Sequence, residues 1–276
     1  MPADRPDLAI IIVTFESRHE IGACLDSVVG HTAPYRADVV VVDNQSTDGT
    51  ATMVREGWPA VRVIDAGGNV GFARANNLGA AATDSEFLLL LNPDTVVPPG
   101  ALAALVRGLA SHPDAAIAGP RLLDAERYAE LSFGPALTPW GEAWQKALGA
   151  LYRRRLRAVV RYVERRTRAA GPRAWVSGAC LLIRRADYAA VGGLDERYFM
   201  YTEDVDLCAA VRARGREVLF VPQAEVLHLR GRSAGRNPET ERLRRLSHLA
   251  YYDKHLPRFA GALRLYLRLT GRRAHA

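Results

Sequence analysis

Cysteine is scarce in this chain, and long hydrophobic runs are missing. The three cysteines, Cys24, Cys180 and Cys208, are far apart and form no C-x-x-C pair, so the sequence predicts neither a disulfide framework nor a zinc site and favours a reducing compartment. The longest apolar runs, at residues 8–13 and 87–91, are well short of the roughly 18 residues of a membrane-spanning helix. No basic segment followed by a long apolar stretch and a cleavage site begins the chain, so we expect a cytoplasmic protein without a signal peptide.

The net charge of +7 is unevenly distributed along the chain. Residues 146–173 contain ten basic side chains and one acidic one, and residues 228–276 contain twelve basic and three acidic ones. The rest of the chain is therefore acidic, unlike a uniformly basic nucleic-acid-binding protein, and we expect no nucleic-acid partner. Both basic segments place arginines among Leu, Val or Tyr at helical spacing, which is typical of helices that lie on an anionic membrane surface. Solvated helix faces or a homodimer contact would give the same pattern.

Strand and helix signals alternate through the first 120 residues. Short apolar runs predict buried strands at residues 8–13, 39–42, 61–64, 87–91 and 115–118, with helical patterns between them at 17–29, 50–56, 72–82 and 100–109. This alternation predicts an α/β fold of Rossmann-like type, with a mostly parallel sheet flanked by helices. In such sheets ligands bind beyond the carboxyl ends of the strands, so we expect a site at residues 14–16, 43–50 and 92–95.

After Pro120 the pattern changes. We expect a basic amphipathic helix over residues 146–170, a strand at 176–183, a helix that Thr202 N-caps and Gly215 ends, strands at 217–221 and 226–229, and two basic helices separated by Pro257. No internal repeat or low-complexity linker is visible in the sequence. We therefore expect one domain over residues 1–235, divided near residue 120, and a basic helical appendage at 236–276.

Polar residues follow several of the predicted strands. Asp43 can accept hydrogen bonds from a nucleoside base or ribose, although Asp also commonly ends strands and starts turns. Gly71 lies in a turn that opens a helix, where free N–H groups and Arg74 suit an anion, and ordinary helix capping explains the turn equally well. Neither G-x-G-x-x-G nor G-x-x-x-x-G-K-[ST] occurs, which disfavours dinucleotide-binding and Walker A sites. Asp94, directed by Pro93, suits a divalent cation that bridges diphosphate oxygens, but Asn-Pro-Asp is also a plain turn sequence.

Two further polar features lie in the second half of the chain. Glu203, Asp204 and Asp206 stand at the predicted start of a helix, where acids complement the positive helix end. Crowded carboxylates also repel one another, which raises their proton affinity and favours a general base. His228 follows an apolar strand, and a lone histidine is more often structural than a ligand. Its interpretation depends on whether the fold brings it near Asp94.

Taken in order, six segments resemble family 2 glycosyltransferases. They are VTF (13–15), DNQSTDG (43–49), NVGFARAN (69–76), LNPD (91–94), WVSGA (175–179) and GGLDERYFMYTEDVDL (192–207). The last segment is the most specific, and the residues of these segments are most similar to those of the bacterial rhamnosyltransferase branch. The resemblance covers roughly residues 8–235 and implies a GT-A fold, in which residues 1–120 bind a nucleotide sugar and residues 121–235 form the acceptor and catalytic half.

The resemblance also implies a role for each candidate site residue, by matching position. The donor-binding set is Thr14, Phe15, Glu16, Asp43, Gly71, Arg74, Asn76, Asn92 and Asp94, and the acceptor side is Gly178, Ala179 and Glu203. Asp94 and His228 would hold a divalent cation, Mn²⁺ or Mg²⁺, and Asp204 would be the catalytic base. Asn92 stands where the D-x-D motif of the family has its first acid, so the ribose contact usually made there is not implied.

The activity implied is an inverting, metal-dependent transfer of a sugar, rhamnose in this branch, from a dTDP- or UDP-sugar. The acceptor would be a hydroxyl group of a glycan or of a polyprenyl-diphosphate-linked saccharide in cell-envelope polysaccharide synthesis. Such an enzyme could attach peripherally to the inner face of the plasma membrane. Two alternatives stay open: a nucleotidyltransferase that makes the nucleotide sugar, and a non-catalytic basic adaptor for a membrane or nucleic acid. The retained Asp94, Asp204 and His228 argue against the adaptor.

Overall fold

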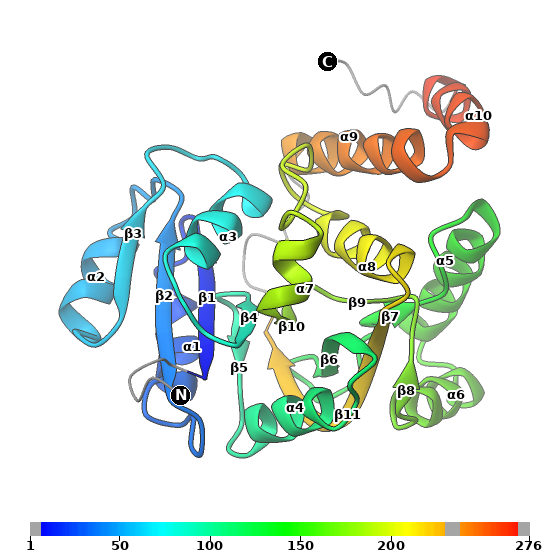
Figure 1. Ribbon diagram of the computed structural model, residues 1–276. Helices are drawn as coiled ribbons and strands as arrows, with labels where there is room; N and C mark the ends of the chain where they lie inside the picture. The colour runs from blue at the N-terminus through cyan, green and yellow to red at the C-terminus, as the bar shows by residue number, and fades with distance from the viewer. Residues whose placement is uncertain (1–6, 230–237, 270–276) are drawn as a thin grey trace.

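A nine-stranded sheet runs through the middle of the protein, with helices on both faces (Figure 1). The computed structural model describes residues 7–229 and 238–269. In spatial order the strands are β3 (Arg62–Asp65), β2 (Ala37–Asp43), β1 (Leu8–Thr14), β4 (Phe87–Leu91), β10 (Cys180–Arg184), β6 (Ala115–Leu123), β11 (Glu217–His228) and β5 (Thr95–Val96), with β8 (Gly171–Pro172) beside β11. Strands β3, β2, β1 and β4 are parallel, as are β6 and β11, whereas β10 is antiparallel to both of its neighbours. The expected α/β class is confirmed.

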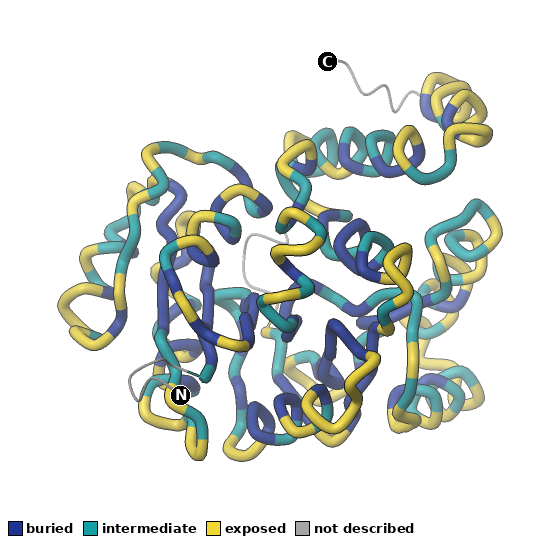
Figure 2. Tube along the Cα trace, in the orientation of Figure 1, coloured by how far each residue is buried: buried dark blue, intermediate teal, exposed yellow. Residues whose placement is uncertain are grey.

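The strands are apolar because helices cover both faces of the sheet. Every residue of β1 and β4 is buried, as is typical of parallel strands between two helical layers. On one face Ile10 and Leu89 belong to a core shared with α1 (Ile21–Val28), α2 (Thr50–Gly57) and α4 (Ala101–Ala110). On the other, Ile11 and Leu90 share a core with α3 (Phe72–Ala81), α7 (Arg185–Ala190) and α8 (Glu203–Ala213). Figure 2 shows the buried strands between partly exposed helices.

Several boundaries differ from the sequence prediction in the second half. The strand expected over 176–183 is divided into β9 (Trp175–Val176), which pairs with β7 (Phe133–Gly134), and β10. The strands expected at 217–221 and 226–229 form one strand, β11, with a register shift between Val221 and Glu225. Thr202 occupies the N-cap position of α8 as expected, but its φ is +74° and its side chain makes no capping hydrogen bond.

The single basic helix expected over 146–170 is two helices, so this prediction is also wrong. They are α5 (Pro139–Arg153) and α6 (Arg157–Thr167). Arg155, between them, has a φ of +53°, which ends the first helix. Leu148 and Val163, one from each helix, are buried in the same cluster, which explains the continuous apolar spacing. Leu156, expected in that apolar stripe, is 46% exposed.

The C-terminal helices pack against α8, the helix whose first turn contains the candidate base Asp204. They are α9 (Pro238–His255) and α10 (Pro257–Leu269), separated as expected before Pro257. Lys254 Nζ and His255 Nε2 lie 2.8 and 2.6 Å from the carboxylate oxygens of Asp206 on α8. The Tyr198 hydroxyl donates to the same carboxylate at 3.0 Å. A buried acid with three partners therefore joins α9 to α8.

A second contact joins α9 to the start of α5. The Glu142 carboxylate lies 2.9 Å from His248 Nε2 and accepts the Tyr252 hydroxyl at 2.6 Å. Burial opposes ionisation of Glu142, but these hydrogen bonds and the charges of His248 and Lys146 outweigh it and lower the pKa of Glu142 to about 2. Glu142 is thus ionised wherever the protein is folded at ordinary pH.

All three cysteines are free and buried, which confirms the absence of a disulfide framework. Burial raises the pKa of the Cys24 thiol to about 12, so this thiol is not a nucleophile at neutral pH. Across residues 7–229 and 238–269, no helix combines the length and the apolar character needed to cross a membrane.

Candidate active site

Buried oxygen atoms that lack partners lie where β1 and β2 end. Thr14 Oγ1, Asp43 Oδ1 and Asn44 Oδ1 are buried and have no hydrogen-bond partner among the described residues. The strands are parallel with Thr14 opposite Asp43, and the Asn44 N–H donates to the Thr14 carbonyl at 2.8 Å. Asp43 Oδ2 accepts the Ser46 N–H at 3.1 Å. Because buried acceptors without donors are costly, this edge suits a ligand that supplies donors, such as a base or a ribose. Asn44 was not predicted individually.

Phe15 and Glu16 extend this edge outward. Glu16 has a φ of +53°, and its Oε1 accepts the N–H and the hydroxyl of Thr47 at 2.6 and 3.0 Å. Its own N–H donates to Ser46 Oγ at 3.0 Å. The loops after β1 and β2 are therefore tied together. The Phe15 side chain remains 47% exposed, which leaves its ring open to a planar group.

Gly71 lets the turn before α3 approach the segment that leads to α8. Its φ is +86°, and a Cβ atom there would lie 2.6 Å from the Phe199 carbonyl oxygen. The Phe72 N–H donates to that same carbonyl at 2.7 Å. Only glycine fits this position, because both the backbone conformation and the available space exclude a side chain. The turn thus joins the first half of the chain to the segment before Asp204.

Arg74 and Asn76 lie on α3 and differ in accessibility. The Arg74 side chain is 58% exposed, with Nε 4.0 Å from Glu196 Oε2. Asn76 is fully buried, its Nδ2 donates to the Phe72 carbonyl at 2.9 Å, and its Oδ1 has no partner in the described part of the chain. The structure leaves Arg74 accessible to an anion and encloses Asn76 within the protein.

Asp94 and His228 come together where β5 meets β11. The pairing of these strands places His228 opposite Thr95, and the Leu229 N–H donates to the Asp94 carbonyl at 2.8 Å. His228 Nε2 lies 3.4 Å from Asp94 Oδ1, and the two side chains are 14% and 13% exposed. The proximity on which the interpretation of His228 depended is therefore present.

Glu130 is a third member of this group that the sequence did not predict. Its Oε2 lies 3.2 Å from His228 Nδ1. Burial opposes a charge on His228, but the hydrogen bonds and charges of Asp94 and Glu130 outweigh it and raise the pKa of His228 to about 9. Glu130 carries no local motif, and 98 residues separate it from His228, so only the fold could reveal the contact.

The chemistry of Asp94 and His228 suits a divalent cation. Two ligands that are each about 2.1 Å from one octahedral ion lie roughly 3 Å apart, and the observed separation of 3.4 Å is close to that. An imidazole nitrogen with a carboxylate oxygen suits Mn²⁺ at least as well as Mg²⁺. In the described ranges no three or more His, Cys, Asp or Glu side chains are arranged to hold an ion. Two protein ligands would therefore need diphosphate oxygens to complete the coordination.

Asp204 lies at the start of α8 and is held by two backbone groups. The Gly178 N–H donates to Oδ2 at 2.7 Å, and the Val205 N–H donates to Oδ1 at 2.8 Å. Burial raises the pKa of Asp204, and these hydrogen bonds oppose the shift. The carboxylate is therefore fixed in orientation and more basic than an exposed one, as a general base must be.

A short backbone path connects Asp204 with the turn that carries Asp94. Gly178 holds Asp204, and the next residue, Ala179, accepts the Asn92 N–H through its carbonyl at 2.9 Å. Cys180 then pairs with Leu91 as β10 joins β4. The candidate base and the candidate ion ligands thus lie along one edge of the sheet.

Glu203 differs from its neighbour Asp204. It is 6% exposed, and its Oε2 is buried without a partner among the residues described. Burial and the charge of Asp204 raise the pKa of Glu203 well above its usual range. Glu203 has no backbone N–H donors from other described residues such as those that hold Asp204, so burial acts on it with less compensation.

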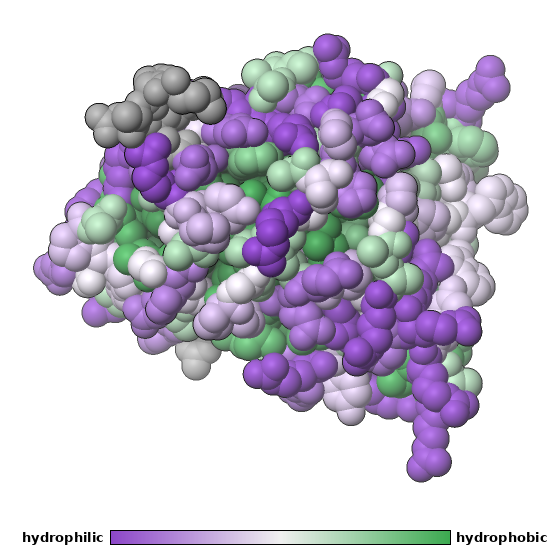
Figure 3. Space-filling view, turned by 60° about the horizontal axis from the view of Figure 1, so that its bottom comes forward, coloured by the Kyte–Doolittle hydropathy of each residue, from purple (hydrophilic) through white to green (hydrophobic). Residues whose placement is uncertain are grey.

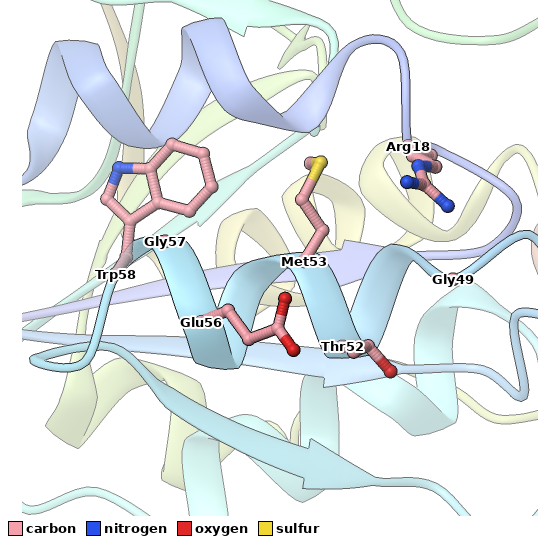
Figure 4. A pocket seen from close by; sticks show the side chains of 7 residues that line it. All are labelled: Arg18, Gly49, Thr52, Met53, Glu56, Gly57 and Trp58. Atoms are coloured by element: carbon pink, nitrogen blue, oxygen red, sulfur yellow. The ribbon is translucent and has the colours of Figure 1, made fainter.

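A separate cavity of about 530 Å³ lies between the start of α1 and α2 (Figure 4). Its lining consists of Arg18, Gly49, Thr52, Met53, Glu56, Gly57 and Trp58. At one end Arg18 Nη1 donates to the Asp48 carbonyl at 2.9 Å. None of the predicted site residues lines this cavity, so it is not the donor site that the sequence indicated.

With its parallel strand ends, its carboxylate–imidazole pair and its candidate base at the start of α8, the protein has the GT-A fold of glycosyltransferases. The chain belongs to glycosyltransferase-like family 2, whose family model matches residues 6–258. The N-acetylglucosaminyl-diphospho-decaprenol L-rhamnosyltransferase of Mycobacterium tuberculosis (strain ATCC 25618 / H37Rv) is 36% identical over 229 residues, covering 78% of this chain and 72% of that protein. The resemblance to rhamnosyltransferases is thereby confirmed.

One more distant relative and one solved structure are also similar to this chain. The low-salt glycan biosynthesis hexosyltransferase Agl10 of Haloferax volcanii is 28% identical over 228 residues, which are 80% of this chain and 66% of the relative. The mannosyltransferase PcManGT of Pyrobaculum calidifontis, solved with GDP-Man and Mn²⁺, superposes with a TM-score of 0.65 at 19% identity and covers 95% of this chain and 69% of its own. At that identity the solved structure establishes the shared GT-A fold alone.

Proposed function

We propose that the protein is an inverting, metal-dependent rhamnosyltransferase that uses a dTDP- or UDP-sugar and a polyprenyl-diphosphate-linked saccharide acceptor. The main support for the proposal is that Asp94, His228 and Asp204 lie along one edge of the sheet. The sugar and the lipid-linked acceptor are supported by the name of the 36% identical mycobacterial relative. The metal is supported by the Mn²⁺ in the Pyrobaculum structure and by the ligand chemistry described above.

In this proposal the ends of β1 and β2 bind the nucleoside. The buried acceptors of Thr14, Asp43 and Asn44 take hydrogen bonds from the base or ribose, and the exposed ring of Phe15 lies beside them. Arg74 is accessible to the phosphates. Asp94 and His228 would hold the cation, which when bound would supply positive charge to the leaving diphosphate.

Asp204 removes the proton from the acceptor hydroxyl as that oxygen attacks the anomeric carbon on the face opposite the diphosphate. The two N–H groups from Gly178 and Val205 fix the carboxylate and leave each oxygen a lone pair for the hydroxyl. Positioned proton transfer of this kind contributes roughly 10²–10⁴-fold to the rate. Attack from the opposite face inverts the anomeric configuration.

The test is a transfer assay over a panel of nucleotide sugars, with and without Mn²⁺. We expect Asp204→Asn to keep donor affinity and to lose at least about 100-fold in transfer rate, whereas Asp253→Asn on the surface serves as a matched control. Turnover of Asp204→Asn within tenfold of wild type would refute the assignment of the base. Pyrophosphate release from a nucleoside triphosphate and a sugar phosphate would instead support the nucleotidyltransferase alternative.

We further propose that the enzyme attaches to an anionic membrane at the inner face of the plasma membrane, through α10. Phe259, Leu265, Tyr266 and Leu269 are 45%, 57%, 53% and 79% exposed, and Arg258, also on α10, is exposed. Large apolar side chains beside arginines on an outward helix face are typical of interfacial helices. The face of the protein shown in Figure 3 is instead mostly hydrophilic, with small scattered hydrophobic patches.

Two exposed tryptophans on α5 provide further aromatic side chains suited to a membrane surface. Trp140 and Trp144 are 83% and 54% exposed, and α5 contacts α9 through Glu142. Co-sedimentation with vesicles that contain 30% anionic lipid tests the proposal. We expect the triple variant Phe259→Ser, Tyr266→Ser, Leu269→Ser to lose binding at least tenfold, and Leu78→Ser, an exposed leucine on α3, to bind as wild type does. Equal binding to neutral and anionic vesicles would contradict it.

A further inference from the structure

Glu130 has no part in the proposed function so far, yet its carboxylate lies directly behind His228. We propose that Glu130 is a positioning residue that holds the His228 ring so that Nε2 faces Asp94 and the ion between them. The inference rests on the proposed metal site and assigns to it a residue that no motif in the sequence marks.

The sheet brings Glu130 to this place. β6 and β11 are parallel, with Leu123 opposite Leu227, so the chain leaves β6 beside the residue that precedes His228. A bridge pairs Leu123 with Ala129, and the Glu130 N–H donates to the Leu122 carbonyl at 2.8 Å. Glu130 is therefore placed by backbone pairing, and its side chain is 9% exposed.

The turn between β6 and Glu130 is itself held from two sides. Asp124 Oδ1 accepts the Tyr128 N–H at 2.7 Å and so closes the turn. Arg155, in the break between α5 and α6, lies 3.5 Å above the Tyr128 ring, and its Nη2 lies 3.7 Å from Asp124 Oδ2. A turn fixed in this way can hold a side chain in one orientation, which a positioning residue requires.

The contacts of His228 divide its two ring nitrogens between two carboxylates. Nδ1 lies 3.2 Å from Glu130 Oε2, and Nε2 lies 3.4 Å from Asp94 Oδ1. Glu130 accepts the hydrogen of Nδ1, so the lone pair of Nε2 is directed at the ion. Because Glu130 lies at the other nitrogen of the ring, it is not a third ligand. Carboxylates behind metal-bound histidines typically increase metal affinity 10–100-fold by orienting the ring and raising its basicity.

The experiment measures Mn²⁺ affinity from the free-Mn²⁺ electron paramagnetic resonance signal, under argon at pH 9, where protons compete least for the imidazole. The titrations contain dTDP or UDP, whichever binds more tightly, and no sugar. We expect Glu130→Ala to weaken Mn²⁺ binding 10–100-fold and Glu130→Gln, which keeps an acceptor, to recover at least half of that loss on a logarithmic scale. Glu126→Ala, in the same turn and exposed, should bind Mn²⁺ as wild type does.

Kinetics separates positioning from other roles. Saturating Mn²⁺ should restore the kcat of Glu130→Ala to within about threefold of wild type, because the ion is then bound despite the looser ring. A persistent loss of kcat would overturn the proposal, as would Mn²⁺ affinity equal to wild type in both Glu130 variants while Asp94→Asn and His228→Ala bind weakly. If Asp94→Asn and His228→Ala also bind Mn²⁺ like wild type, the proposed metal site itself is wrong.

Discussion

Replacement of Asp206 by alanine tests whether the contact between the C-terminal helices and α8 contributes to the free energy of unfolding. The carboxylate is 3% exposed and accepts hydrogen bonds from Tyr198, Lys254 and His255. Removing one partner from a buried charged pair typically costs about 3–5 kcal/mol. Because Lys254 and His255 are 28% and 25% exposed, they can regain water, and we expect a loss near the lower limit, about 3 kcal/mol. For a chain of 276 residues that corresponds to roughly 5 °C in Tm.

Urea denaturation followed by tryptophan fluorescence and far-ultraviolet circular dichroism measures the loss. Asp253→Ala is the matched control, since Asp253 is 46% exposed and pairs with Arg264 on the surface, where an ion pair contributes about 1 kcal/mol or less. A loss below 1 kcal/mol for Asp206→Ala, or a loss equal to that of the control, would refute the reasoning. Asp206→Asn, which keeps an acceptor, should lie between the two.

Three more substitutions have outcomes that follow from the site and its supports. Glu142 has a pKa of about 2, so the stability that its ionised form contributes is complete above about pH 4.5 and is lost as the pH falls toward 2. In Glu142→Gln the free energy of unfolding, measured by urea titrations at a series of pH values, should therefore fall by up to about 3 kcal/mol less between these pH values than in wild type. Gly71→Ala, which places a Cβ 2.6 Å from the Phe199 oxygen, should cost about 2–4 kcal/mol in the same assay, whereas Gly30→Ala, with a similar φ and open space, should cost about 1 kcal/mol. Glu203 has a raised pKa, so the stability that its protonated form contributes is present at low pH and is lost as the pH rises through this raised pKa. Glu203→Gln should be at least as stable as wild type at pH 8 and keep the transfer rate within about threefold. A loss of transfer as large as that of Asp204→Asn would contradict the assignment of Asp204, and not Glu203, as the base.

The first half of the fold could be predicted because each buried strand there is a short apolar run bounded by turn residues. The break between α5 and α6 could not. Leu148 and Val163 keep helical spacing across it while facing one cluster, and no glycine or proline marks the left-handed Arg155. Periodicity describes which side chains share a core, and two helices in contact can satisfy it as well as one.

Some residues of the candidate site could likewise be predicted from the sequence, and others could not. Asp94 and Asp204 stand in local patterns, and His228 follows a recognisable strand, so sequence alone singled them out. Glu130 reaches His228 only because β6 and β11 are neighbours in the sheet, and Asn44 became notable only when its oxygen proved buried without a partner among the described residues. Asn76, in the same motif as Gly71, proved to be enclosed within α3 and its surroundings. Roles that depend on non-local strand pairing or on burial cannot be recognised from short sequence motifs.

The attachment of α9 to Asp206 has a consequence for the order in which the enzyme is made. Lys254 and His255 follow Asp206 by 48 and 49 residues, an interval that a ribosome adding about 5–20 residues per second crosses in roughly 2–10 s. Throughout that interval Asp206, the buried acid of α8, lacks its hydrogen-bond partners Lys254 and His255. The first strands of the sheet can therefore assemble early on the ribosome, while the start of α8, where the candidate base lies, reaches its final form only after the last helices have emerged.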